Sequence, residues 1–263
     1  KANLRGADLV IFGTAVNRHY HRLVVKGDIK TPADLKGKTI GLPILGGPQD
    51  FLLYVLCQKW GLAYDKDVKA QNMGKEFARL IAVTDGTVDG VTSAAPLSKL
   101  KALGLNVLAD PRTWDELAPY MMMVATRPYL SANRDQAKRF LRALAEAQTY
   151  YLTQADEALS VAYDKLGASK GDARDNYVEG GPLLFVAPAL PDAQAMAVAR
   201  DYIATIPDFA EKAKAFDLAS MLDDSLVNEL VAEGVYAPVI AAKQKLTAEL
   251  AAAPKTALGQ PGE

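Results

Sequence analysis

Cysteine and histidine are scarce in this sequence of 263 residues, which has one cysteine, Cys57, and two histidines, His19 and His21. A single cysteine excludes an internal disulfide and any metal site built from several cysteines. Cys57 lies in the apolar run at residues 51–57, so we expect a buried and unreactive thiol. That run is the longest apolar block, and it is far shorter than the roughly 18 residues that a membrane-spanning helix needs.

An excess of either charge is also missing. The 30 basic and 31 acidic residues give a net charge of −1, without the basic excess that is typical of nucleic-acid-binding proteins. The sequence therefore predicts no nucleic-acid partner. The metalloprotease motif His-Glu-x-x-His and the redox motif Cys-x-x-Cys are absent. We predict no catalytic residue, no metal and no cofactor, although in an enzyme either histidine could act as a general acid or base.

Short apolar segments alternate with helix-like segments in the first half of the chain. Strands are predicted at residues 7–16, 21–26, 39–42, 67–72, 88–92, 106–109 and 120–126, and helices at 48–60, 75–84 and 97–103. Such alternation is typical of parallel βαβ units.

After residue 126 the apolar residues recur with the helical period. Helices are predicted at residues 134–152, 155–166, 193–205, 209–216, 224–233 and 238–252, and residues 255–263 are expected to form a solvated tail. An α/β half followed by a helical half indicates two lobes, with the late helices packing back on the first lobe.

Residues 29–50 form the most informative stretch. A helical turn begins at Thr31, a buried strand follows, and Gly46 and Gly47 precede a helix that starts at Pro48. Glycines before a helix let a ligand approach the backbone N–H groups, which favour an anion. The alternative is an ordinary capped helix packed in the sheet. No arginine or lysine can be placed beside this loop from sequence alone, so a neutral or aromatic ligand stays open as an alternative.

Two further segments carry candidate contacts. Asn17 and His19 follow the strand at residues 7–16 and are expected to line the rim of a cleft. His19 and His21 have the spacing to share one face and bind a metal, but no third ligand lies near them in the sequence. Ser93 lies where a strand meets a helix, and its hydroxyl could donate a hydrogen bond to a ligand.

Four segments occur in the order typical of a known family. They are GADLVI at residues 6–11, LVV at 23–25, TPADLKGKTIG at 31–41 and GTVDGV at 86–91, the last followed by Pro96. With these motifs the chain resembles the substrate-binding proteins of ABC transporters, in the nitrate/sulfonate/taurine and thiamine-pyrimidine (NMT1/THI5-like) group. The resemblance is strongest over residues 6–150.

The resemblance implies an α/β type II periplasmic-binding-protein fold, with two lobes, hinge crossings near residues 28–34 and 120–127, and extra C-terminal helices. The implied limits are residues 1–30 for part of lobe 1, 31–124 for lobe 2, and 125–263 for the return to lobe 1 with the C-terminal helices and the tail. Members of the group begin with a strand–helix–strand–helix segment before the position of Gly6. We therefore expect that this part of lobe 1 is missing from the sequence or is supplied by another chain.

The resemblance further implies a small solute in an interlobe cleft, of sulfonate, oxyanion, carboxylate or pyrimidine-like chemistry, delivered to an ABC permease in the membrane. Such a protein works in the periplasm or outside the cell, with or without a lipid anchor. The alternatives are an enzyme on the same fold, of the pyrimidine-precursor synthase type with His19 as a candidate functional residue, and a ligand-sensing module. The expected ligand contacts are Thr14, Asn17, His19, Gly46, Gly47, Gln49, Asp50, Ser93, Ala94 and Pro96.

Overall fold

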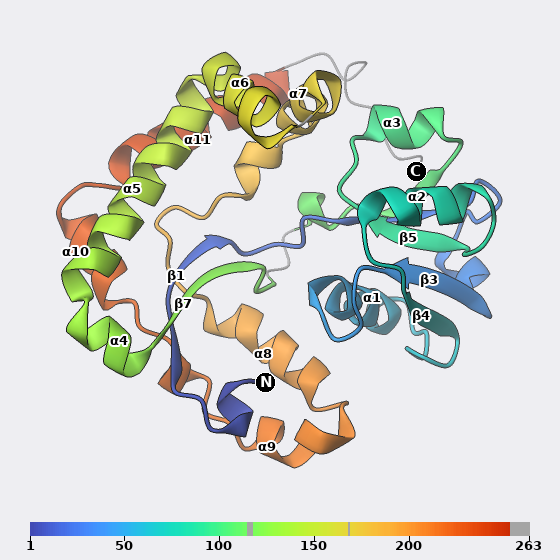
Figure 1. The fold of residues 1–263 in the computed structure, drawn as a ribbon, viewed down its shortest axis with the longest axis horizontal. Coiled ribbons are helices and arrows are strands. Elements are labelled where there is room, and N and C mark those ends of the chain that lie inside the picture. The colour runs from blue at the N-terminus through green and yellow to red at the C-terminus, as the bar shows by residue number, and fades with distance from the viewer. Residues whose placement is uncertain (115–117, 168, 253–263) are drawn as a thin grey trace. The chain divides into compact units, whose positions relative to one another are not determined.

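Figure 1 shows the computed structural model, which describes residues 1–114, 118–167 and 169–252. The predicted tail at residues 255–263 lies outside the described residues. The chain forms two compact units, one from residues 1–18 and 118–252 (unit 1) and one from residues 19–114 (unit 2). Within these ranges no helix is both long and apolar enough to cross a membrane.

The limits of the two units lie nearer the N-terminus than the lobe limits expected at residues 30 and 124. β2 (Arg22–Val25), which the resemblance places in lobe 1, pairs with two strands of unit 2. β7 (Met121–Thr126), which the resemblance places in a hinge crossing, pairs with β1 (Leu9–Val16) in unit 1. Strand pairing thus explains why the compact units divide near residue 18 and before residue 118, while the lobe limits that the resemblance implies stay a prediction.

Unit 2 is built on a five-stranded sheet in the order β4-β3-β5-β2-β6. β3 (Lys38–Leu42) runs parallel to β4 (Val68–Asn72) and to β5 (Gly90–Ser93), as predicted. β2 differs from the prediction, because it lies antiparallel between β5 and β6 (Asn106–Ala109). The connecting helices are α1 (Pro48–Lys59), α2 (Glu76–Thr84) and α3 (Leu97–Ala102).

Both faces of this sheet are buried, as expected for a mostly parallel sheet covered by helices. Leu23 and Val25 of β2 belong to the core on the α1 side, whereas Val24 belongs to the core with α2 and α3. Successive strand residues point to opposite faces, which explains this alternation. Cys57 is fully buried in the α1 core, and burial raises the pKa of its thiol to about 11, which confirms the expected buried thiol.

Unit 1 combines the antiparallel pair β1–β7 with a set of helices. Val10 and Phe12 of β1 point into a core shared with α5, α10 and α11. Leu9 and Ile11, on the opposite face of the strand, line a cavity instead. The helices of unit 1 are α4 (Arg127–Ala132), α5 (Arg134–Thr153), α6 (Ala155–Leu166), α7 (Lys170–Val178), α8 (Ala193–Ile203), α9 (Ala210–Lys214), α10 (Ser225–Ala232) and α11 (Ala237–Ala252).

Two helices of unit 1, α4 and α7, are not predicted by the sequence. α4 follows β7 directly and is started by Thr126, whose hydroxyl accepts a hydrogen bond from the N–H of Tyr129 at 3.3 Å. α7 fully buries Tyr177 alone, with Ala173 and Val178 partly buried against the same core. Short helices with so few buried residues lack the apolar period on which a prediction depends.

Candidate ligand-binding site

The expected ligand contacts are distributed over both units. Thr14 and Asn17 belong to unit 1, and the others belong to unit 2. In unit 2 the glycine-rich loop before α1 and the turn before α3 follow the carboxyl ends of β3 and β5, which are adjacent and parallel. Loops at the carboxyl ends of parallel strands are the usual place for a ligand in α/β sheets.

The glycine-rich loop before α1 is held by acceptors of the chain itself. The carboxylate of Asp50 accepts a hydrogen bond from the N–H of Gly46 at 2.6 Å, and the side-chain oxygen of Asn72 accepts one from the N–H of Leu45 at 2.6 Å. The hydroxyl of Tyr64 donates to the other carboxylate oxygen of Asp50, which is 2% exposed. At Gly46 and Asp50 the structure therefore matches the alternative of a capped, packed helix, and it contradicts the expectation of an open backbone cradle.

Gly47 and Gln49 are the other two expected contacts of this loop. Gly47 is the N-cap of α1, and a Cβ atom at this position would lie 2.7 Å from Cγ2 of Ile44. Gln49 lies in the first turn of α1, with its Nε2 at 3.4 and 3.3 Å from Nδ1 and Nε2 of His21. Because a neutral imidazole has one acceptor nitrogen, Gln49 can donate to one ring nitrogen at a time.

His19 is buried, His21 is half-buried, and both are uncharged near neutral pH. His19 is 5% exposed, and its ring centroid lies 5.3 Å from that of Phe51. Burial, together with the nearby His21, lowers the pKa of His19 to about 4. Burial also lowers the pKa of His21 to about 4, with Glu76 opposing this shift and Arg79 adding to it. His19 is therefore a packed side chain and not part of an open rim.

Metal binding finds no support in the part of the chain that the structure describes, where no three His, Cys, Asp or Glu side chains are grouped to hold an ion. Residues 17–21 are not in a strand, so the shared face on which the two-histidine hypothesis depends does not form. His21 instead contacts Gln49.

The side chain of Glu76, the first residue of α2, binds the turn between β5 and α3. The sequence did not single out this glutamate. Oε1 of Glu76 accepts hydrogen bonds from Oγ of Ser93 at 2.5 Å and from the N–H groups of Ala94 and Ala95 at 2.8 and 3.1 Å. The hydroxyl oxygen of Ser93 also accepts from the N–H of Ala95 at 3.0 Å. The expected contacts Ser93 and Ala94 are thus engaged by Glu76, and Pro96 is buried as the N-cap of α3.

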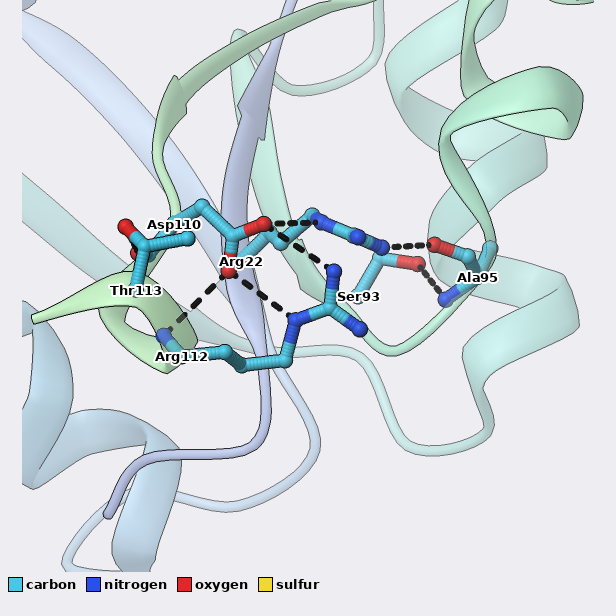
Figure 2. A network of polar contacts seen from close by, with 6 residues as sticks. All are labelled: Arg22, Ser93, Ala95, Asp110, Arg112 and Thr113. Atoms are coloured by element: carbon cyan, nitrogen blue, oxygen red, sulfur yellow. Dashed lines mark hydrogen bonds and ion pairs between the residues drawn. The ribbon is translucent and has the colours of Figure 1, made fainter. Parts of the chain in front are cut away.

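Arg22 binds the same turn through a backbone carbonyl oxygen, as Figure 2 shows. Its side chain is fully buried, with Nη1 donating to the backbone oxygen of Ala95 at 2.6 Å and Nε donating to the carboxylate of Asp110 at 2.8 Å. Arg112 donates to that carboxylate from Nε and Nη2, at 3.0 Å each. Asp110 therefore ties the end of β6 to the start of β2 and, through Arg22, to the turn.

Thr14 and Asn17 line one small cavity in unit 1, of about 10 Å³, which has room for roughly one water molecule. The N–H of Thr14 donates to the backbone oxygen of Ala189 at 2.8 Å, and the backbone oxygen of Asn17 accepts from the N–H of Ala118 at 2.7 Å. Asp192 also lines this cavity. The structure thus brings these two expected contacts together next to a carboxylate.

A larger cavity of about 200 Å³ in unit 1 has mostly apolar walls. It shares Ile11, Met122 and Met196 with the small cavity. Its remaining walls come mainly from residues 1–4, from α8 and from the segment at residues 213–221, with one residue each from β1 and β7. Walls of this kind fit an apolar group better than a charged one.

Two cations lie near the end of β1, and neither was indicated by the sequence. Nζ of Lys243, in α11, donates to the backbone oxygen of Phe185, which forms a β-bridge with Val16. Burial lowers the pKa of Lys243, and the positive charge of Arg18 lowers it further. The end of β1 therefore carries positive charge from two elements that are far apart in the sequence.

Residues 167–171 have the spacing Gly-x-Ser-x-Gly of a hydrolase nucleophile elbow. Such an elbow lies between a strand and a helix, whereas Ser169 lies between the helices α6 and α7. Its hydroxyl oxygen accepts from the N–H of Asp172 at 3.3 Å and caps α7. The spacing therefore has a structural explanation here.

Comparisons with solved structures identify the fold. The periplasmic aliphatic sulphonate binding protein SsuA from Escherichia coli aligns with a TM-score of 0.65 at 22% identity, covering 85% of this chain and 71% of that chain. The alkanesulfonate-binding protein SsuA from Xanthomonas axonopodis pv. citri, bound to MOPS, gives 0.62 at 20% identity, with 85% and 76% covered. The desulfurization enzyme DszB, in a mutant complex with biphenyl-2-sulfinic acid, gives 0.57 at 16% identity, with 86% and 80% covered. These similarities establish a type II periplasmic-binding-protein fold, which occurs in binding proteins and in an enzyme.

Sequence comparisons identify the family. No curated protein matches the chain significantly. The model of the family described as NMT1/THI5 like matches residues 1–158, more than half of the chain. This agrees with the resemblance carried by the motifs at residues 6–11, 31–41 and 86–91. The chain therefore belongs to the NMT1/THI5-like family.

Proposed function

We propose that this protein binds a small solute and delivers it to the permease of an ABC importer. Family membership and the fold support this proposal, since two of the similar structures are described as sulfonate-binding proteins. The observation that carries it is the set of fixed polar groups at the strand ends of unit 2. Glu76 and Arg22 hold the turn before α3 from opposite sides, and Gln49 contacts His21 beside it. Polar groups that are fixed before a ligand arrives reduce the entropic cost of binding.

The side chains of this region fit binding better than acid–base or nucleophilic catalysis. A histidine with a pKa of about 4, as at His19 and His21, is a weak base at neutral pH. The thiol of Cys57 is fully buried, and its pKa of about 11 keeps it protonated. These properties support a non-catalytic role.

Native mass spectrometry of the purified protein, followed by isothermal titration calorimetry, tests solute binding. The titrations use alkanesulfonates, inorganic oxyanions, carboxylates and pyrimidines. We expect a saturable one-to-one complex, from which the solute is recovered chemically unchanged after long incubation. A lack of binding across the whole panel contradicts the proposal. Conversion of the bound solute into a product supports instead an enzyme on this fold, as DszB is described.

Delivery to an importer requires the protein to work outside the cytoplasmic membrane, in the periplasm or outside the cell, with or without a lipid anchor. Fractionation of cells that express the native gene, with an antibody to the protein, locates it. Affinity purification from detergent extracts of the same cells is expected to recover a permease. A purely cytosolic location contradicts delivery but leaves solute binding open to the sensor alternative.

A further inference from the structure

We infer that Glu76 determines which class of solute unit 2 accepts, selecting a protonated amino group or another positively charged hydrogen-bond donor and disfavouring an anion. This rests on the proposed function and adds to it a chemical class. At unit 2 we therefore expect a positively charged group of the solute, and not the anion that the glycine-rich loop suggests from the sequence.

The donors of the turn before α3 are already paired with a carboxylate. Oε1 of Glu76 lies 2.5 Å from Oγ of Ser93, 2.8 Å from the nitrogen of Ala94 and 3.1 Å from that of Ala95. An anionic group of a solute would have to displace this carboxylate, or lie beside it against like-charge repulsion. The turn therefore offers no favourable place for an anion while Glu76 is bound there.

The second oxygen of the same carboxylate can accept a hydrogen bond from a solute. Among the residues that the structure describes, the hydrogen bonds to Glu76 all end on Oε1, and the side chain is half-buried. An ionised carboxylate has acceptor sites on both oxygens. A hydrogen bond between two charged partners is shorter and about twice as strong as a neutral one.

The charge of Arg79 lies near enough to Glu76 to interact with it, but the hydrogen bonds of the neighbouring basic side chains that the structure describes do not end on this carboxylate. The guanidinium of Arg79 donates to the backbone oxygen of Thr92 at 3.2 and 3.1 Å and to that of Gly74, so its hydrogen bonds are directed to the backbone. His21 stays uncharged at neutral pH, because burial lowers its pKa to about 4. No described residue of the protein donates a hydrogen bond to Oε2 of Glu76. A positively charged group of a solute can therefore bind this oxygen.

Arg22 keeps the acceptor in place. It binds the backbone oxygen of Ala95 at 2.6 Å, while the N–H of the same residue binds Glu76. Since Arg22 is fully buried on Asp110, the turn and the carboxylate on it are fixed before a solute arrives.

Pairs of solutes that differ only by an amino group test this inference by calorimetry on the full chain. Suitable pairs are 3-aminopropanesulfonate with propanesulfonate and 3-aminopropanoate with propanoate. We expect the amino member to bind about tenfold more tightly, as one charge-assisted hydrogen bond allows. Glu76→Gln removes the charge but keeps an oxygen for the three donors, so the fold is retained and the preference is lost.

Asp65→Asn is the matched control. It removes the same charge from an exposed loop of unit 2, where the φ of +62° suits asparagine. This variant is expected to keep the amino preference of the unaltered protein. A loss of preference in both variants would mean that net charge, and not Glu76, governs the selection.

The outcomes separate the inference from the proposed function. The inference is overturned if the two members of each pair bind equally well, or if Glu76→Gln keeps the preference. It is also overturned if other solutes bind but neither pair does. In each of these cases the proposal of solute binding still stands. No binding of any solute overturns both. If Glu76→Gln does not fold, the salt dependence of the unaltered protein decides, because a preference based on charge weakens as ionic strength rises. A preference that salt does not change overturns the inference.

Discussion

Arg22→Met is expected to lower the free energy of unfolding of unit 2 by about 3 kcal/mol. The Arg22 side chain is 0% exposed and donates to both Ala95 and Asp110, so its loss leaves a buried backbone oxygen and a mostly buried carboxylate with fewer donors. Removing one partner of a buried ion pair costs roughly 3–5 kcal/mol. Arg112 keeps its two side-chain bonds to Asp110, which places the expected loss at about the lower end of that range.

Urea unfolding followed by tryptophan fluorescence measures this loss in the right unit. Both tryptophans of the chain, Trp60 and Trp114, pack against the α1 core of unit 2. Lys69→Met is the control, because it breaks an exposed ion pair of the same unit, with Asp65 at 3.9 Å, and is expected to cost less than about 1 kcal/mol. A loss for Arg22→Met no larger than that of the control would refute the argument that this buried network holds the turn.

Three further results are expected. The folded-state pKa values of His19 and His21, about 4, lie below the ordinary 6.5, so protons bind the unfolded chain first. The contribution of the histidines to stability is therefore constant above about pH 7 and decreases as the pH falls from 6.5 to 4, by up to roughly 3 kcal/mol per histidine; unfolding curves at several pH values check this, and a flat profile between pH 6.5 and 4 would contradict it. Gly90→Ala places a Cβ 2.8 Å from the backbone oxygen of a neighbouring strand and should cost about 1–3 kcal/mol, more than Gly41→Ala, whose nearest neighbour is a flexible methionine; equal losses in urea titrations would argue against this packing. The thiol of Cys57 should react with a disulfide reagent only when unit 2 unfolds, and rapid labelling of the folded protein would show that it is accessible.

The order of strands and helices in unit 2 could be predicted because its signals are local. The turn after Thr31 is closed by Asp34, whose carboxylate accepts from the N–H and the hydroxyl of Thr31 at 2.8 and 3.0 Å. α1 begins at Pro48, directly after two glycines, as such helices do. Each of these contacts joins residues within one turn of chain, which a sequence pattern displays.

The placement of β2 and the contacts of the candidate site could not be predicted in this way. The ion pair of Arg22 with Asp110 joins residues 88 positions apart, and Glu76 reaches Ser93 over 17 positions. An acidic residue at the start of a helix, such as Glu76, also has an ordinary local explanation in the helix dipole. Pairing across the sheet therefore decides which carboxylate meets which turn.

The expectation of an open backbone cradle at the glycine-rich loop failed for a related reason. The sequence shows which backbone donors precede α1, but it does not show which acceptor of the chain binds them. Asp50 lies four residues after Gly46 in the first turn of α1, where a carboxylate commonly binds back to the chain before the helix. The spacing of Gly46 and Asp50 in the sequence is therefore a local signal from which this hydrogen bond can be predicted.

Two-dimensional amide NMR of the protein, titrated with the solute that calorimetry identifies, tests the central claim most directly. We predict that the amide signals of Gln49, Ala94 and Ala95, at the carboxyl ends of β3 and β5, shift progressively to saturation. The signals of Lys26 and Asp89, which form an ion pair at 2.7 Å at the opposite end of the sheet, are predicted to stay unchanged. Shifts centred on Lys26 and Asp89, or no shift at the carboxyl ends under saturating solute, would contradict a binding site at this end of unit 2.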